Sequence, residues 1–210
     1  MKNVIYHKTC NNQFKIQYQT TIIKVSDVHC DYSKTEKLCL EGCRNYNKKY
    51  SCPPKSPDFK VLSKKYSHFV VNIFRIDLAE YKQQYNTIRM TNVVNKSVQR
   101  KVFNKAFLNN NFTEKIVILE NGSCRLCKKC NLQNGMPCKY PDKMRPSLEA
   151  CGINVDALVI KCFEFDLKWY KKNKQACFPE YQCTVGGILT NNPDLIIQTL
   201  NEAILQHKKE

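Results

Sequence analysis

Residues 67–77, Ser-His-Phe-Val-Val-Asn-Ile-Phe-Arg-Ile-Asp, are predicted to form a buried β-strand. The run is short and rich in β-branched and aromatic side chains, which is typical of a strand in the interior of a protein. Three other segments share this strand-like character: residues 14–25, 115–120 and 181–190. The sequence therefore predicts a β-sheet that contains a buried strand at residues 67–77.

Residues 92–109 are predicted to form an amphipathic helix, because apolar side chains recur at every fourth position: Val94, Val98, Val102 and Ala106. A second amphipathic helix is predicted over residues 194–207, and a short helix over residues 146–151, between a proline and a glycine that suit its ends. Residues 155–167 are apolar and fit either a helix or a strand. Because strands and helices mix along the chain, the predicted fold class is α/β or α+β. We expect a mixed β-sheet flanked by helices, with cysteine-rich metal-binding loops.

The chain has 210 residues, a length that fits one domain. We expect a single metal-binding domain over residues 1–210, with the cysteine-rich segments 30–54 and 122–141 inserted in it. Hydrophobic residues make up 42% and charged residues 25%, as in ordinary globular proteins, which excludes collagen-like and disordered chains. No apolar run approaches the ~18–20 residues that span a bilayer, and the N-terminus is too polar for a signal peptide. We therefore expect a cytoplasmic protein with no membrane partner.

Thirteen cysteines are the most informative feature of the composition. A secreted protein held together by disulfides would usually be shorter, carry an export signal and have an even number of cysteines. In a reducing cytoplasm, clustered cysteines instead indicate metal ligation or catalysis. Five cysteines have no ligand-like spacing and are expected to be packed or incidental thiols: Cys10, Cys151, Cys162, Cys177 and Cys183.

The main cysteine motif lies between Gly122 and Pro141 and has the spacing C-x2-C-x2-C-x7-C. Its four cysteines are the candidate ligands of the main metal site: Cys124, Cys127, Cys130 and Cys138. Three thiolates at intervals of three residues can wrap three corners of a cubane, and bacterial ferredoxins begin with the same run. We therefore expect a 4Fe-4S cluster. The alternatives are structural zinc, which usually takes two separated cysteine pairs, and thiols without metal.

A second group consists of Cys39, Cys43 and Cys52. Cys39 and Cys43 are four residues apart, which puts both thiols on one face of a helix, and two prolines follow Cys52. The trio can hold a second cluster or metal, with Cys30 or His29 as the fourth ligand. The alternative is packing, since free cysteine is among the most buried residue types. One cluster is therefore expected from the main motif, and a second would use this trio.

Three blocks of the sequence resemble a cysteine-rich family of anaerobic archaea and bacteria, described as predicted metal-binding proteins of unknown function. The blocks are residues 39–43 with 50–54, residues 124–141, and residues 144–150 with 152–155. The resemblance implies metal binding, with an iron–sulfur centre and no established reaction. Lys139 stands where the family often carries arginine beside the last cysteine, which keeps the charge but loses the bidentate geometry.

The formal charge of +16 is unevenly distributed. Residues 81–113 contain six basic and no acidic residues, and residues 121–145 contain six basic residues against Asp142 alone. The basic residues are Lys82, Arg89, Lys96, Arg100, Lys101 and Lys105 in the first segment, and Arg125, Lys128, Lys129, Lys139, Lys143 and Arg145 in the second. Such segments either dock an acidic redox protein, a phosphorylated cofactor or nucleic acid, or form a solvated surface. Because no nucleic-acid-binding motif accompanies the charge, an acidic redox protein is the preferred partner and nucleic acid is not expected.

Three functions are compatible with these features. We favour an iron–sulfur protein that transfers electrons in an anaerobic cytoplasm. The second is an enzyme that uses an open-corner cluster or metal beside a substrate pocket. No nucleophile–base arrangement, radical-type C-x3-C-x2-C motif or nucleotide fingerprint supports it, so no catalytic residue is assigned. The third is a zinc-stabilised basic binding protein, which only the charge supports.

Overall fold

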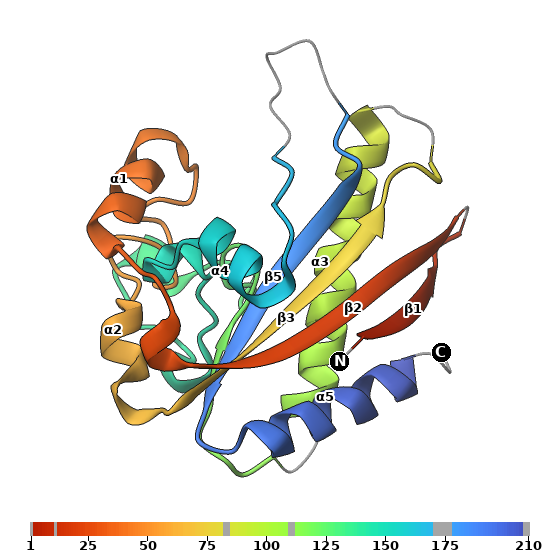
Figure 1. The fold of residues 1–210 in the computed structure, drawn as a ribbon. Helices are drawn as coiled ribbons and strands as arrows, with labels where there is room; N and C mark the ends of the chain where they lie inside the picture. The colour runs from red at the N-terminus through yellow and green to blue at the C-terminus, as the bar shows by residue number, and fades with distance from the viewer. Residues whose placement is uncertain (1, 11, 82–84, 109–111, 170–177, 208–210) are drawn as a thin grey trace.

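The computed structural model describes residues 2–10, 12–81, 85–108, 112–169 and 178–207 (Figure 1). Five strands form one sheet in the order β1-β2-β3-β5-β4. Their bounds are β1 Lys2–Lys8, β2 Gln13–Lys24, β3 His68–Asp77, β4 Val117–Leu119 and β5 Tyr181–Thr190. Helices cover this sheet, which confirms an α+β fold.

The pairings between these five strands are all antiparallel, so the expectation of a mixed sheet is wrong. In each pair of long strands, the second strand begins at the end of the sheet where the first one finishes. Lys24 at the end of β2 pairs with His68 at the start of β3, and Asp77 at the end of β3 pairs with Tyr181 at the start of β5. A parallel pair would require the chain to cross from one end of the sheet to the other.

Four of the five strands are predicted by the sequence pattern. β3 lies in the middle of the sheet, and most of its side chains are buried, as expected for residues 67–77. β4 is shorter than the predicted strand over 115–120. The pattern does not predict β1, because Ile5 is its one buried side chain and a lone buried residue shows no alternation.

α3 (Tyr85–Phe107) and α5 (Pro193–His207) cover one face of the sheet (Figure 1). The four residues that recur along α3 are all buried in this layer of the core: Val94, Val98, Val102 and Ala106. The helices predicted over 92–109 and 194–207 are therefore confirmed, although α3 begins earlier and residue 109 lies outside the described residues. None of the helices in the described ranges combines the length and the apolar character that a bilayer crossing requires.

The opposite face of the sheet is covered by α2 (Phe59–Leu62), by α4 (Val155–Phe163) and by the segment before α4. Residues 155–167, which fit either a helix or a strand, thus begin with a helix. The short helix predicted over 146–151 is wrong, because only Glu149–Cys151 form a single 3-10 turn. The first residues of this segment instead lie along Glu120, whose N–H donates to the Pro146 carbonyl at 2.9 Å.

α1 (Tyr32–Gly42) packs against this second layer through its first residue. The sequence pattern does not predict this helix, since none of its side chains is buried. The Asp31 N–H donates to the Gly152 carbonyl at 2.7 Å, and a Cβ on Gly152 would lie 2.8 Å from Tyr32 Cα. Gly152, at φ 92°, therefore allows a backbone approach that any side chain would block. This approach positions the helix that carries Cys39.

We expect Gly152→Ala to lower the melting temperature more than Gly135→Ala does. Both glycines have positive φ, 92° and 68°, so each substitution carries a left-handed backbone penalty of about 1–2 kcal/mol. Only at Gly152 would the new Cβ also collide with the backbone of Tyr32, which adds about 1–3 kcal/mol. Thermal unfolding of the two variants measures the difference. Equal melting temperatures would show that the docking of α1 does not depend on this close approach.

Candidate metal centre

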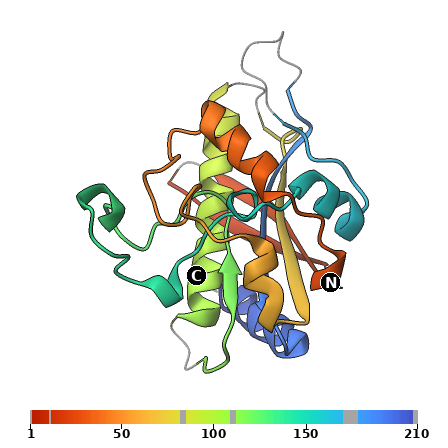
Figure 2. The same ribbon diagram turned by 90° about the vertical axis from the view of Figure 1, so that its left-hand side faces the viewer.

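The main cysteine motif follows β4, which is the last strand in the sheet order. Residues 120–145 leave this edge of the sheet as a long loop beside α3 (Figure 2). The loop contains two short 3-10 turns, Asn131–Asn134 and Pro141–Lys143, and Gly135 ends the first turn at φ 68°. An edge strand thus delivers the motif to the surface, where loops commonly carry binding residues.

The four predicted ligands of the main motif line a single pocket: Cys124, Cys127, Cys130 and Cys138. Leu126, Tyr140 and Met144 contribute to the wall, and residues 49–51 close it from the other cysteine-rich segment. All four cysteines are partly exposed. The fold therefore brings together, close to the surface, the ligand set that the spacing suggests.

Two residues of the cysteine-rich segment 30–54 hold the first cysteine of the main motif in place. Ser51 is 1% exposed, and its hydroxyl accepts a hydrogen bond from the Cys124 N–H at 3.0 Å. Lys49 Nζ donates to the Ser123 hydroxyl at 2.9 Å and to the Cys124 carbonyl at 3.0 Å. The start of the motif is therefore fixed by residues about seventy positions earlier in the chain.

The later part of the loop is tied down by two further hydrogen bonds. The Tyr50 hydroxyl donates to the Met136 carbonyl at 2.9 Å, and the Asn131 side-chain amide donates to the Pro137 carbonyl at 3.0 Å. The cysteine spacing does not single out residues 49–51 as part of the main site. The signal that could have found them is their position directly before the last cysteine of the second group.

The second cysteine group is also brought together. Cys39 lies in the last turn of α1, and Cys43 follows the helix, with its N–H donating to the Cys39 carbonyl at 2.9 Å. Burial raises the pKa of the Cys39 thiol, and the thiols of Cys43 and Cys52 raise it further. Burial also raises the pKa of Cys52, which is 6% exposed. The three thiols thus lie close enough to influence one another electrostatically.

The two cysteine groups adjoin each other. The pKa of Cys52 is raised first by burial and then by the thiols of Cys43, in its own group, and Cys130, in the main motif. Ser51 joins the same two groups, because its hydroxyl lies 3.9 Å from the Cys52 sulfur and also accepts the Cys124 N–H. Cys130 is therefore a neighbour of the second group that spacing along the sequence does not reveal.

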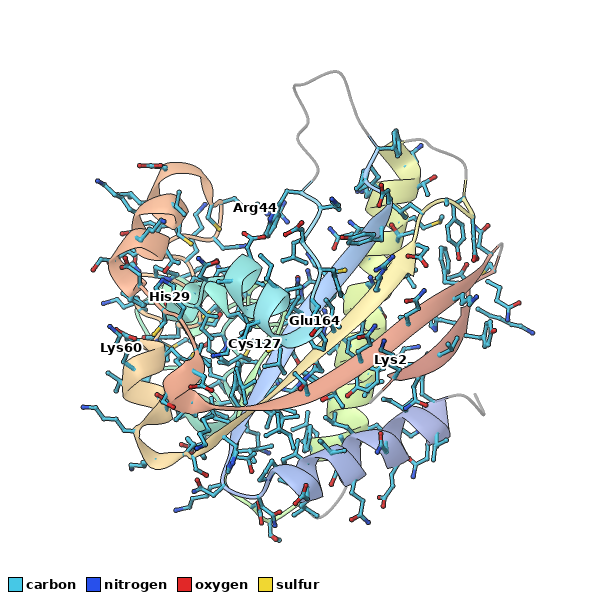
Figure 3. The ribbon with its side chains drawn as sticks, viewed as in Figure 1. Lys2, His29, Arg44, Lys60, Cys127 and Glu164 are labelled. Atoms are coloured by element: carbon cyan, nitrogen blue, oxygen red, sulfur yellow. The ribbon has the colours of Figure 1, made fainter. Side chains whose placement is uncertain are left out.

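Cys30 and His29, the suggested fourth ligands of the second group, lie at the start of α1, whereas Cys39 lies near its end. A helix rises about 1.5 Å per residue, so roughly 10 Å of α1 separates the two positions. Cys30 forms an isolated β-bridge with Ile153. Burial raises the Cys30 pKa, and the charges that modify it belong to Lys60 and two aspartates. Figure 3 labels His29 and Lys60 on this side of the molecule.

The chemistry of the donor set fits a thiolate-bound metal centre. All twelve cysteines among the described residues are free, and thiolates are ligands of both zinc and iron–sulfur clusters. Leu126 and Met144 give the pocket an apolar part. In the part of the chain that the structure describes, no three or more Cys, His, Asp or Glu side chains are arranged as the ligands of one metal ion. The four thiols of the main motif line their pocket without meeting at a point.

The cysteines without ligand spacing lie elsewhere in the fold. Cys10 is exposed, next to β1, and Cys151 is fully buried in the second layer of the core. Burial raises the pKa of Cys162 to about 11 and that of Cys183 to about 12, as expected for packed thiols. Cys177 lies outside the described residues.

A family model described as "Predicted metal-binding protein (DUF2284)" matches residues 21–189. The comparisons with curated proteins and with solved structures gave no match. The matched range contains both cysteine groups, the edge strand β4 and the central strand β3. It covers well over half of the sequence, and it confirms the resemblance carried by the three blocks between residues 39 and 155. The chain therefore belongs to this family of predicted metal-binding proteins.

Proposed function

We propose that Cys124, Cys127, Cys130 and Cys138 hold a 4Fe-4S cluster and that the protein transfers electrons. The observation that carries this proposal is the shared pocket. Four thiols of one loop line it, and the rest of its wall is mainly apolar. Four cysteine thiolates bind a cubane through different irons, so thiols spread around one pocket suit it. The C-x2-C-x2-C run at the start of the loop is the one that bacterial ferredoxins use.

When bound, a 4Fe-4S cluster accepts and releases single electrons. The residues of this chain would hold it and set its reduction potential. Lys49 brings a positive charge to the Cys124 carbonyl and partly offsets the rise that burial causes in the pKa of the nearby Cys52 thiol. Positive charge near a cluster stabilises its more negative, reduced form, and the apolar side chains of Leu126 and Met144 restrict contact with water.

The surface around the pocket suits an acidic redox protein as the partner. Four lysines of the cysteine loop are exposed: Lys128, Lys129, Lys139 and Lys143. A basic patch of this kind attracts an acidic protein and orients it during encounter. Because the cysteines are themselves partly exposed, a partner docked on these lysines would lie close to the ligands.

A second candidate function rests on the trio of Cys39, Cys43 and Cys52. Their thiols interact with one another, and none of them belongs to the main ligand set. A cubane held by three cysteines keeps one iron open to an external ligand, which is how this protein would act as an enzyme. A fourth ligand such as Cys30 would instead close the site and leave it to carry electrons.

Replacing any one of the four main cysteines by Ala should remove the iron and sulfide of one cluster. It should also lower the melting temperature, because ligation is linked to folding. Cys10→Ala and Cys183→Ala are the controls and should keep the metal content of the unchanged protein. Iron, sulfide and zinc analysis of anaerobically purified protein makes the comparison. Stoichiometric zinc without iron, or equal loss in all six variants, would contradict a 4Fe-4S cluster on this motif.

If the trio holds a second cubane, anaerobically purified protein should contain about eight irons per chain. The triple replacement of Cys39, Cys43 and Cys52 by Ala should then halve the iron content. If the protein contains about four irons per chain and keeps them after the triple replacement, the trio holds no cluster and only packs. Iron analysis before and after substitution distinguishes the two outcomes.

Docking of an acidic redox protein should make electron transfer strongly dependent on salt. The Debye length falls from about 10 Å at 0.1 M to about 3 Å at 1 M, so the attraction of the exposed lysines is screened. We expect the rate of reduction by a small acidic redox protein to fall steeply over this range, as measured by stopped-flow absorbance. The control is a small uncharged reductant, whose rate should stay flat. If the rates with both donors are independent of salt concentration, the lysines form only a solvated surface.

A further inference from the structure

A second cavity, of about 220 Å³, lies directly beside the metal pocket. It is lined by Arg100 and Asn104 of α3 and by four residues of the loop 120–145: Glu120, Arg125, Leu126 and Arg145. Leu126 also lines the metal pocket, so the two spaces share a wall residue. The cavity therefore lies between the two basic segments, residues 81–113 and 121–145.

Two arginines of this cavity have buried N–H groups without a hydrogen-bond partner among the described residues. Arg145 is 3% exposed, and its Nη1 is used by the carboxylate of Glu120 and by the Asn104 side-chain oxygen, the latter at 2.9 Å. Its Nη2 is buried and has no hydrogen-bond partner among the described residues. The buried Nε of Arg100 has no partner within those ranges either. Buried charged donors are normally satisfied, so these two call for an acceptor that the chain does not itself supply.

Positive charge around the cavity exceeds negative charge. Burial lowers the pKa of Arg100, and the neighbouring charges of Arg125 and Arg145 lower it further, while Glu120 opposes them. Lys96, one helical turn before Arg100, has its pKa lowered by burial and then by Arg125, with a further contribution from Arg44.

Arg44 follows α1 and is labelled in Figure 3. Three arginines line the cavity, Arg100, Arg125 and Arg145, against one carboxylate, that of Glu120. The lining therefore has an excess of two positive charges. Such crowding of like charges is relieved by a bound anion.

We propose that this cavity binds the phosphate group of a small molecule next to the metal centre. Guanidinium groups present rigid forks of N–H donors that match the oxygens of a phosphate. A dianion matches an excess of two positive charges better than a single carboxylate does. The buried position of Arg145, and a cavity of this size, favour a small ligand over the backbone of a nucleic acid, which would contact exposed residues.

Isothermal titration of the anaerobically purified, metal-loaded protein with inorganic phosphate tests the proposal, with acetate and succinate titrated in parallel. We expect saturable binding of phosphate at one site per chain and weaker binding of both carboxylates. Arg100→Gln and Arg125→Gln should each weaken phosphate binding at least about tenfold, because each removes a charged hydrogen-bond donor. The matched control is Lys101→Gln, which removes the same charge from an exposed position of α3 that does not line the cavity.

The metal content of each sample is measured alongside, so this proposal can fail while the cluster assignment stands. Arg125 follows Cys124 directly, so Arg125→Gln can also lose metal. If it does, the phosphate affinity of metal-loaded Arg100→Gln, whose substitution lies on α3, decides the test. Wild-type phosphate affinity in metal-loaded Arg100→Gln, an equal loss in Lys101→Gln, or carboxylates that bind more tightly than phosphate would each overturn the proposal. No saturable phosphate binding to the unchanged protein would overturn it as well.

Discussion

The buried ion pair between Arg145 and Glu120 closes the base of the cysteine loop. Glu120 follows β4 directly and is 7% exposed, while Arg145 comes 25 residues later. The backbone holds the same junction, since the Glu120 N–H donates to the Pro146 carbonyl and Glu120 bridges to Ser147. Every ligand of the main motif lies between these two ends. Removing one partner of such a buried pair typically costs about 3–5 kcal/mol, so the position of the loop depends on both residues.

The loop, closed at its base, is held against the cysteine-rich segment 30–54. Ser51 and Lys49 bind the backbone at Cys124, and the thiol of Cys130 lies near that of Cys52. Two cysteine groups about seventy residues apart thus become neighbours at one edge of the sheet. The same ion pair forms part of the wall of the cationic cavity, so one interaction positions both the candidate metal pocket and the candidate anion site.

Much of the fold follows from the periodicity of the sequence. β2, α3 and α5 are predicted because each buries one face, which leaves a period of two or four residues. β3 and β5 are buried on both faces, so they show instead as short apolar runs rich in β-branched residues. α1 is the counterexample. It buries no side chain, and its Leu38 and Leu40 are 60% and 61% exposed, so no apolar stripe marks it in the sequence. The helix expected over 146–151 fails for a related reason, because pairing with Glu120 overrides the local preference of that segment.

The sequence by itself determined the two candidate ligand groups and the excess of basic residues, because ligands joined by short loops show as close spacing along the chain. Only the tertiary structure decided which distant residues meet: Cys130 with Cys52, and Lys96 and Arg100 with Arg125 and Arg145. Periodicity reports which face of an element is buried but not what covers it. The pairing of β4 at the sheet edge, and the ion pair that returns the loop to it, are long-range contacts that leave no local signal.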